Sequence, residues 1–205
     1  MKAKPFFSPK TLCFSVVLIL IVSFDAKAQY WGVQPLSSDT TSLNAFFSND
    51  DKRVMYLGKA ASGFANIYAY DLKATGSTQI TDVSDGSIVK FYQVPNKPLL
   101  IYMKASAGKP TDYHLYKIAN IPKGAPEDLT PTKEGVSNIM LGASYNGRYV
   151  YYSSNKSNFT KTDFYRYDIA QNISELVFAN DKNYELMSWT KDQNLVLLKE
   201  PLTSR

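Results

Sequence analysis

The single histidine of this chain, His114, limits the chemistry that the sequence can support. A serine-hydrolase triad requires an imidazole that takes the proton of the nucleophile, so a triad here would have to use His114. The G-x-S-x-G turn that often presents a nucleophilic serine is missing. The stretch GVSNI (135–139) lacks the second glycine, and in GASYNG (142–147) it lies one residue too far along. We predict no catalytic residue in this chain and interpret GASYNG as a turn.

Sequence patterns for cofactors and metal ions are missing as well. AGKPT (107–111) offers the Gly-Lys pair of a phosphate-binding loop, but Met103 stands at the first glycine position and Pro110 disfavours the helix start. No His and Cys cluster matches a zinc site, and no acidic series matches an EF-hand loop. Asp50 and Asp51 could bind calcium weakly, although a solvated turn is the simpler interpretation. We predict no cofactor and no bound metal.

The N-terminal residues have the features of a secretory signal peptide. Lysines precede a mostly apolar run of thirteen residues, Leu12–Phe24, and a following A-K-A sequence ends at Ala28. The run is shorter than the roughly 18–20 residues that a membrane-spanning helix needs. Cys13 opens the run instead of following it, which argues against a lipoprotein anchor. We predict that residues 1–28 are removed, that the mature chain 29–205 is periplasmic or extracellular, and that it has no membrane contact after cleavage.

Removal of the signal peptide changes the charge of the chain. The whole sequence has a formal net charge of +5, but the mature part has 19 basic and 17 acidic residues, a net charge of +2. This balance gives no reason to expect nucleic acid as a partner. The mature part also contains no cysteine, so a hydrophobic core and sheet hydrogen bonds must hold it together.

Short aromatic and β-branched runs between turn residues predict an all-β fold. Helical periodicity is weak throughout the mature part, whereas 15 tyrosines and 11 phenylalanines suit the half-buried surface of a sheet. The expected strands include RVMYLGK, NIYAYDL, SIVKFYQV, PLLIYMK, YHLYKI, GRYVYYSS, DFYRYDI, SELVF and NLVLLKE.

These strands repeat with a period near 48 residues. We align the strand endings Tyr70-Asp71-Leu72, Tyr116-Lys117-Ile118 and Tyr167-Asp168-Ile169, which lie 46 and 51 residues apart. The following strands, centred on Ile80, Leu129 and Leu176, lie 49 and 47 residues apart. About four short strands in a unit of this length is typical of a β-propeller blade, whose two faces must be covered by neighbouring blades.

The mature part holds about three and a half such blades. We expect units at about 43–90, 91–139 and 140–188, with the start of another at 189–205. A closed propeller typically needs four to eight blades, so we interpret the chain as an incomplete β-propeller and the N-terminal part of something longer. The alternative is a short open array that pairs with another copy.

The same alignment suggests a structural role for His114. It places His114 where the other two units carry Tyr68 and Tyr165, all on one face of their strands. A flat, amphipathic side chain packed between blades fits this position better than a catalytic base does.

Two stretches resemble known propeller families. SNDDKRVMYL (48–57) and SYNGRYVYY (144–152) resemble the S-P-D-G-K openings of TolB-type repeats. The stretch from Tyr151 to Asp181, which includes DFYRYD, is similar to the N-terminal propeller of prolyl-oligopeptidase-like serine peptidases, the group with acylaminoacyl- and dipeptidyl-peptidase members. In that family the propeller covers an α/β-hydrolase domain, restricts access to peptides, and leaves the catalytic triad to the hydrolase.

This resemblance implies a non-catalytic role for the chain. We expect the propeller part of an exported peptidase, gating peptide access to a C-terminal hydrolase domain that this chain does not contain. The main alternative is a TolB-like periplasmic propeller that acts as a protein-binding module. A weaker alternative is a sugar-binding propeller, because aromatic faces can stack on sugar rings, although packing between blades explains most of the tyrosines.

Overall fold

The computed structural model describes residues 45–119, 124–131, 135–190 and 196–200, apart from the side chains of 189 and 196. The predicted signal peptide, residues 1–28, lies outside the described residues, so its cleavage stays a prediction. All of the described residues belong to one compact unit, Ser37–Arg205. Among them we find no helix with the length and apolar character to cross a membrane.

The described residues form fourteen strands and no helix. The first sheet consists of β1 (Phe46–Phe47), β2 (Arg53–Lys59), β3 (Ala65–Asp71) and β4 (Gly76–Gln79). The second consists of β5 (Gly86–Gln93), β6 (Leu99–Ser106), β7 (Lys109–Ala119) and β8 (Pro126–Asp128). The third consists of β9 (Asn138–Ala143), β10 (Tyr149–Ser154), β11 (Asp163–Asp168) and β12 (Ile173–Phe178), and a two-stranded sheet pairs β13 (Glu185–Trp189) with β14 (Val196–Lys199).

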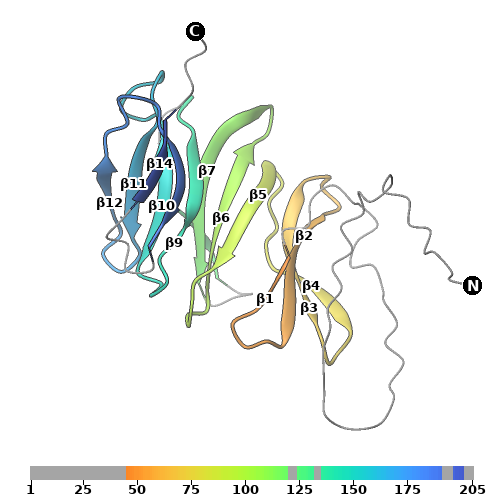
Figure 1. The fold of residues 1–205 in the computed structure, drawn as a ribbon. Coiled ribbons are helices and arrows are strands. Elements are labelled where there is room, and N and C mark those ends of the chain that lie inside the picture. The colour runs from red at the N-terminus through yellow and green to blue at the C-terminus, as the bar shows by residue number, and fades with distance from the viewer. Residues whose placement is uncertain (1–44, 120–123, 132–134, 191–195, 201–205) are drawn as a thin grey trace, which may run out of the picture. The chain divides into compact units, whose positions relative to one another are not determined.

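Each four-stranded sheet is an antiparallel meander in which the strands follow chain order, as Figure 1 shows. We call these sheets blade 1 (β1–β4), blade 2 (β5–β8) and blade 3 (β9–β12). The arrangement confirms the predicted all-β class and the incomplete β-propeller. The boundaries proposed for the sequence units stay a prediction.

Blade 2 is covered on both faces, which explains the apolar sequence of its second strand. In β6, Leu100 and Tyr102 point into the core shared with blade 1, while Leu99, Ile101 and Met103 point into the core shared with blade 3. Successive side chains of a strand point to opposite faces, so a strand that is packed on both sides is mostly apolar, and Lys104 is the one charged residue here. The sequence LLIYMKA is accordingly buried along its whole length.

A stacked pair of tyrosines recurs across the second and third strands of each blade. The pairs are Tyr56–Tyr68, Tyr102–Tyr116 and Tyr152–Tyr165, with ring centroids 5.6, 5.3 and 5.4 Å apart. In each pair the two residues are direct cross-strand partners. The third-strand tyrosines therefore lie 48 and 49 residues apart, which confirms the predicted period.

The stacked pairs correct the alignment of the middle copy. Tyr116 corresponds to Tyr68 and Tyr165, not to Tyr70 and Tyr167 as the sequence alignment assumed. The error is two residues, and a shift of two keeps every side chain on the same face of its strand. The alternation of the sequence therefore could not reveal the slip.

The outer strands are shorter than the sequence suggested in the first two blades. β4 ends at Gln79 and β8 ends at Asp128, so Ile80 and Leu129 follow these strands instead of lying at their centres. Leu176 lies within β12, as predicted. The peptide N–H groups of Ile80 and Leu129 each donate a 2.8 Å hydrogen bond back to the third strand of their blade. Both side chains then enter the cores between blades.

Candidate functional site

His114 occupies the position in blade 2 that Asn66 occupies in blade 1 and Asp163 in blade 3. Each of the three lies two residues before the stacked tyrosine of its third strand. The sequence alignment placed His114 at the position of Tyr68 and Tyr165, and this prediction is wrong. The two-residue slip described above accounts for it.

The polar side chain at this position holds the segment that leads to the next blade. In blade 1 the N–H of Val83 donates to Asn66 Oδ1 at 2.8 Å. In blade 3 the N–H of Asn180 donates to Asp163 Oδ1, also at 2.8 Å. Buried peptide groups outside a sheet need such partners, because an unpaired buried N–H is costly.

In blade 2 the ring of His114 lies among carbonyl and carboxylate oxygens. Nδ1 lies 3.1 Å from the carbonyl oxygen of Thr130 and 3.5 Å from Asp128 Oδ2. Nε2 lies 3.6 Å from Asp112 Oδ1, a buried atom that accepts no hydrogen bond within the described part of the chain. When Nδ1 carries the proton, it donates a hydrogen bond to the carbonyl oxygen of Thr130. These neighbours, a carbonyl and two carboxylates, are hydrogen-bond acceptors, and the non-catalytic role of His114 stays a prediction.

Two lysines lie against the stacked tyrosines of blades 2 and 3. Lys104 is buried, and its Nζ donates to both carboxylate oxygens of Asp85 at 2.8 Å and lies 4.8 Å from the centroid of the Tyr116 ring. The hydrogen bond from Lys104 lowers the pKa of Asp85 against the opposing effect of burial. Burial raises the pKa of Tyr102, so its phenol stays neutral and cannot act as a base near neutral pH.

Lys156 forms the corresponding contact in blade 3 but comes from the loop after β10. Its Nζ lies 3.8 Å from the centroid of the Tyr165 ring and donates to the Tyr152 hydroxyl at 3.1 Å. Burial lowers the pKa of Lys156. The Tyr152 hydroxyl in turn donates to Ser174 on β12, which ties the second strand of the blade to the fourth.

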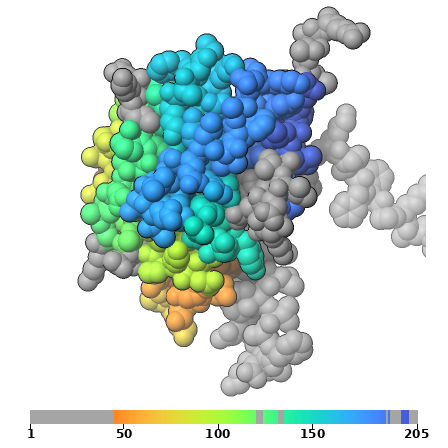
Figure 2. Space-filling model, turned by 90° about the vertical axis from the view of Figure 1, so that its left-hand side faces the viewer, coloured from red at the N-terminus to blue at the C-terminus, as the bar shows by residue number. Residues whose placement is uncertain are grey.

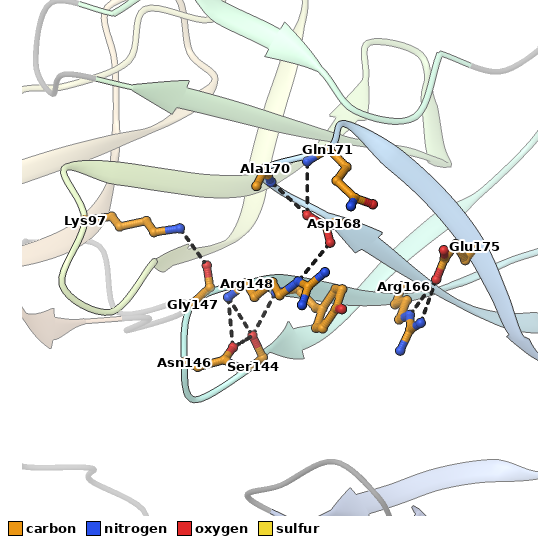
Figure 3. A network of polar contacts seen from close by, with 11 residues as sticks. Lys97, Ser144, Asn146, Gly147, Arg148, Arg166, Asp168, Ala170, Gln171 and Glu175 are labelled. Atoms are coloured by element: carbon orange, nitrogen blue, oxygen red, sulfur yellow. Dashed lines mark hydrogen bonds and ion pairs between the residues drawn. The ribbon is translucent and has the colours of Figure 1, made fainter.

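A polar network joins the turns at one end of blades 2 and 3 (Figure 3). The hydroxyl of Ser144 accepts hydrogen bonds from the N–H groups of Arg148 and Tyr149, and Lys97 Nζ crosses from blade 2 to the carbonyl of Gly147 at 3.2 Å. Gly147 has a φ of 67°. This confirms that GASYNG ends in a turn, which its last glycine permits.

The carboxylate of Asp168 links this turn to the one after β11. Its Oδ1 accepts from the N–H groups of Ala170 and Gln171 at 2.9 and 3.0 Å, and its Oδ2 accepts from Arg148 Nε at 3.0 Å. Burial acts to raise the pKa of Asp168, but these hydrogen bonds outweigh it and lower the pKa. Asp71 Oδ1 accepts from the same two positions of the corresponding turn in blade 1, so this turn is part of the repeat.

Arginine and tyrosine side chains are exposed at this end of blade 3. The guanidinium carbons of Arg148 and Arg166 lie 4.8 and 4.7 Å from the centroid of the Tyr149 ring. Arg148 is 53% exposed, Arg166 is 40% exposed, and Tyr145 is 73% exposed. We call these four residues the turn-end surface. Arginine and tyrosine are enriched where proteins contact one another, so this surface is the candidate functional site.

The acidic pair Asp50 and Asp51 forms part of a turn. Asp50 Oδ1 accepts hydrogen bonds from the Ser48 hydroxyl at 2.6 Å and from the N–H of Lys52 at 3.3 Å, and Asp51 has a φ of 54°. Within the described ranges, no three His, Cys, Asp or Glu side chains are grouped closely enough to hold a metal ion.

The family model described as the dipeptidyl peptidase IV (DPP IV) N-terminal region matches residues 16–139, more than half of the chain. The chain belongs to this family. The match spans blades 1 and 2, so these two blades are those of a DPP IV N-terminal region, and blade 3 lies beyond the match apart from the first two residues of β9. No curated protein matches the chain.

Solved structures with a similar fold are propeller proteins. TolB from Acinetobacter baumannii matches 78% of this chain with a TM-score of 0.56 and 14% identity, and the chain covers 38% of it. A putative TolB from Agrobacterium tumefaciens matches 69% of this chain with a TM-score of 0.52 and 16% identity, and the chain covers 48% of it. The tricorn protease matches 76% of this chain with a TM-score of 0.55 and 10% identity, and the chain covers 15% of it.

These structures have longer chains than the one described here, which spans less than half the length of either TolB. At these identities the likeness concerns the fold. In this DPP IV N-terminal region, the sequence predicted the turn at GASYNG, which lies at the candidate site. It did not predict the turn-end surface. The signal was present in G-R-Y at 147–149, where the first turn leads into β10, and in Y-R-Y-D at 165–168, which ends β11 before the second turn, because both place an arginine beside a tyrosine.

Proposed function

We propose that this chain is the non-catalytic N-terminal propeller of an exported serine peptidase of the prolyl-oligopeptidase type. In this proposal it gates peptide access to a hydrolase domain outside the chain. The observation that carries the proposal is the match of residues 16–139 to the DPP IV N-terminal region. The packing of three successive blades around two shared cores supports it, because a gate must hold its shape while peptides pass.

The turn-end surface supplies the contact with the hydrolase domain in this proposal. Arg148 and Arg166 are held against Tyr149 by cation–π contacts and by ion pairs to Asp168 and Glu175. Side chains that are already fixed lose little conformational entropy when a partner binds. The peptide substrate meets the propeller and the hydrolase together, and the catalytic nucleophile, base and acid belong to the hydrolase.

The proposal is tested on the complete product of the reading frame that contains this chain. We expect that product to hydrolyse short aminoacyl or dipeptidyl reporter substrates and to leave folded proteins intact. This chain alone is expected to show no turnover above buffer. A complete product without a hydrolase domain, or one that cleaves nothing, would overturn the proposal.

A second candidate is a periplasmic protein-binding module. The fold likeness to two TolB structures over 78% and 69% of this chain favours it. This candidate predicts that the complete product binds envelope proteins in a pull-down and hydrolyses none of the reporter substrates. The two functions are therefore separated by one assay.

A further inference from the structure

A lysine bridges the first strands of blades 2 and 3. Lys90 belongs to β5, and its Nζ donates hydrogen bonds to the carbonyl oxygens of Met140 and Leu141 on β9, at 3.0 and 3.5 Å. The pairing of β5 with β6 shifts beside Lys90, and a bulge of this kind redirects the side chains next to it. Two backbone carbonyls of the next blade therefore hold the Lys90 ammonium.

The two residues that bind Lys90 have counterparts in the two-stranded sheet. In β9 the extra residue of a bulge is Leu141, directly after Met140. In β13 the extra residue of a bulge is Met187, directly after Leu186. Each bulge interrupts the pairing of the first strand of its sheet with the second, which leaves backbone groups without a ladder partner. Leu186 and Met187 therefore take the places in β13 that Met140 and Leu141 take in β9.

The space beside these counterparts is open. A cavity of about 240 Å³ lies between β9 and β13 and is lined by Leu141, Leu186, Met187 and Ser188. Figures 1 and 2 show the two-stranded sheet, in dark blue, beside blade 3. Met187 is 55% exposed, so the cavity is open to solvent. The strand β9 reads NIMLGA and has no cationic residue that could bridge to β13 as Lys90 bridges to β9.

We propose that this cavity binds a primary alkylammonium group, the side chain of a lysine in a peptide. Leu141, Leu186 and Met187 contact the methylene stem of that lysine. The carbonyl groups at the β13 bulge accept hydrogen bonds from its ammonium, as the carbonyls at the β9 bulge accept them from Lys90. A lysine side chain combines an apolar stem with three N–H donors, so it matches both parts of the cavity.

The size of the cavity limits the ligand to one side chain. Small-molecule pockets usually measure about 300–1,000 Å³, and this cavity is smaller, so we expect a Kd in the roughly millimolar range. The inference rests on the proposed function only for the source of the lysine, a peptide that passes the propeller. Binding to this chain needs no hydrolase domain, so a failure to bind would leave the proposed peptidase role untouched.

The first experiment follows isotope-labelled methionine methyl groups of the chain by NMR. Met187 lines the cavity, whereas Met55 lies in the core between blades 1 and 2 and is the internal control. Nα-acetyl-lysine amide should shift the Met187 resonance and leave that of Met55 in place. Nα-acetyl-norleucine amide has the same carbon stem without the ammonium and should bind about tenfold more weakly. Equal binding of the two compounds, an unmoved Met187 resonance, or an equal shift of Met55 would overturn the proposal.

The second experiment blocks the cavity. Ser188→Trp places a large side chain in it and should raise the Kd for Nα-acetyl-lysine amide about tenfold or more. Thr78→Trp is the matched control, because it puts the same side chain on the exposed strand β4 of blade 1, and it should leave the Kd unchanged. The Met55 resonance reports whether each variant keeps its core. An unchanged Kd in folded Ser188→Trp would show that the ligand binds elsewhere and would contradict the proposed site.

Discussion

Tyr102 and Tyr116 stack across β6 and β7 with ring centroids 5.3 Å apart, and the pair faces the core between blades 1 and 2. Tyr102 is 1% exposed. The same pair recurs in blades 1 and 3, so it marks the register of the whole repeat. Stacked aromatic side chains bury a large area and add a geometric preference to it.

Truncation of Tyr102 is expected to destabilise the protein strongly. Tyr102→Ala leaves a cavity in the core between blades 1 and 2 and should lower the free energy of unfolding by about 3–5 kcal/mol. Urea denaturation followed by tyrosine fluorescence measures the change. Tyr145→Ala is the control, since Tyr145 is 73% exposed, and a loss of similar size there would contradict the assigned packing.

The ion pair of Asp85 and Lys104 is expected to make stability depend on pH. The pKa of Asp85 is lowered from its usual 3.8 because Lys104 donates a hydrogen bond to its carboxylate. A lowered pKa in the folded state means that the stabilisation is complete well above pH 3.8 and disappears as the pH falls below that value. Denaturation at pH 7 and pH 3 measures this difference.

Asp85→Asn should remove this pH-dependent part of the stability, because Lys104 loses its charged partner. The free energy of unfolding at pH 7 should fall by only about 1–2 kcal/mol, because the side chain of Asp85 is largely exposed and water screens the pair. Glu185→Gln removes an exposed ion pair with Lys199 and is expected to change stability by about 0.5 kcal/mol or less. Equal effects of the two substitutions would argue against a special role of the Asp85 pair.

His114 occupies the same position in its blade as Asn66 and Asp163 do in theirs, and this predicts which substitutions of His114 the fold tolerates. His114→Asn introduces the residue found at this position in blade 1 and should cost about 1 kcal/mol or less. His114→Tyr introduces the residue that the sequence alignment assigned to the position and should cost about 1–3 kcal/mol by overpacking. Thermal unfolding of the two variants compares them directly. If His114→Tyr is more stable than His114→Asn, the result would favour the sequence alignment that placed His114 with Tyr68 and Tyr165.

The turn at Gly147 is expected to require glycine for two separate reasons. Its φ is 67°, and an added Cβ would lie 2.9 Å from Val94 Cγ1. Gly147→Ala should therefore cost about 1–3 kcal/mol. Gly63→Ala separates the two causes, because Gly63 has a φ of 84° with no atom within 4 Å of the added Cβ, and it should cost less. Urea denaturation measures both variants, and equal losses would mean that the contact with Val94 has no effect.

The signal peptide prediction can be checked by the mass of the exported protein. Expression with the native N-terminus should yield a product that begins at Gln29, found by intact mass measurement of the extracytoplasmic fraction. Ala28→Lys removes the small residue at the cleavage site and should leave the precursor uncut. A product that keeps residues 1–28 would contradict both the cleavage and the proposed export route.

Local sequence determined the fold class, the repeat and the turns. Alternating apolar residues produce strands by themselves, and Asp71 and Asp168 fix the same turn through hydrogen bonds within four residues of chain. The last glycine of GASYNG was likewise identified as a turn residue from its type and place. These features involve neighbours along the chain, and so a period near 48 residues was visible without coordinates.

Only the tertiary structure decided the register of the middle copy, the place of His114 and the exposure of β12. A shift of two residues keeps each side chain on its face, so only the stacking of Tyr102 on Tyr116 fixed the alignment. In the turn-end surface, Arg148 from the turn before β10 and Arg166 from β11 contact the same ring. Whether ISELVF is buried or open depends on which strands lie beside it. That is a property of packing between segments far apart in the chain, which a local pattern does not contain.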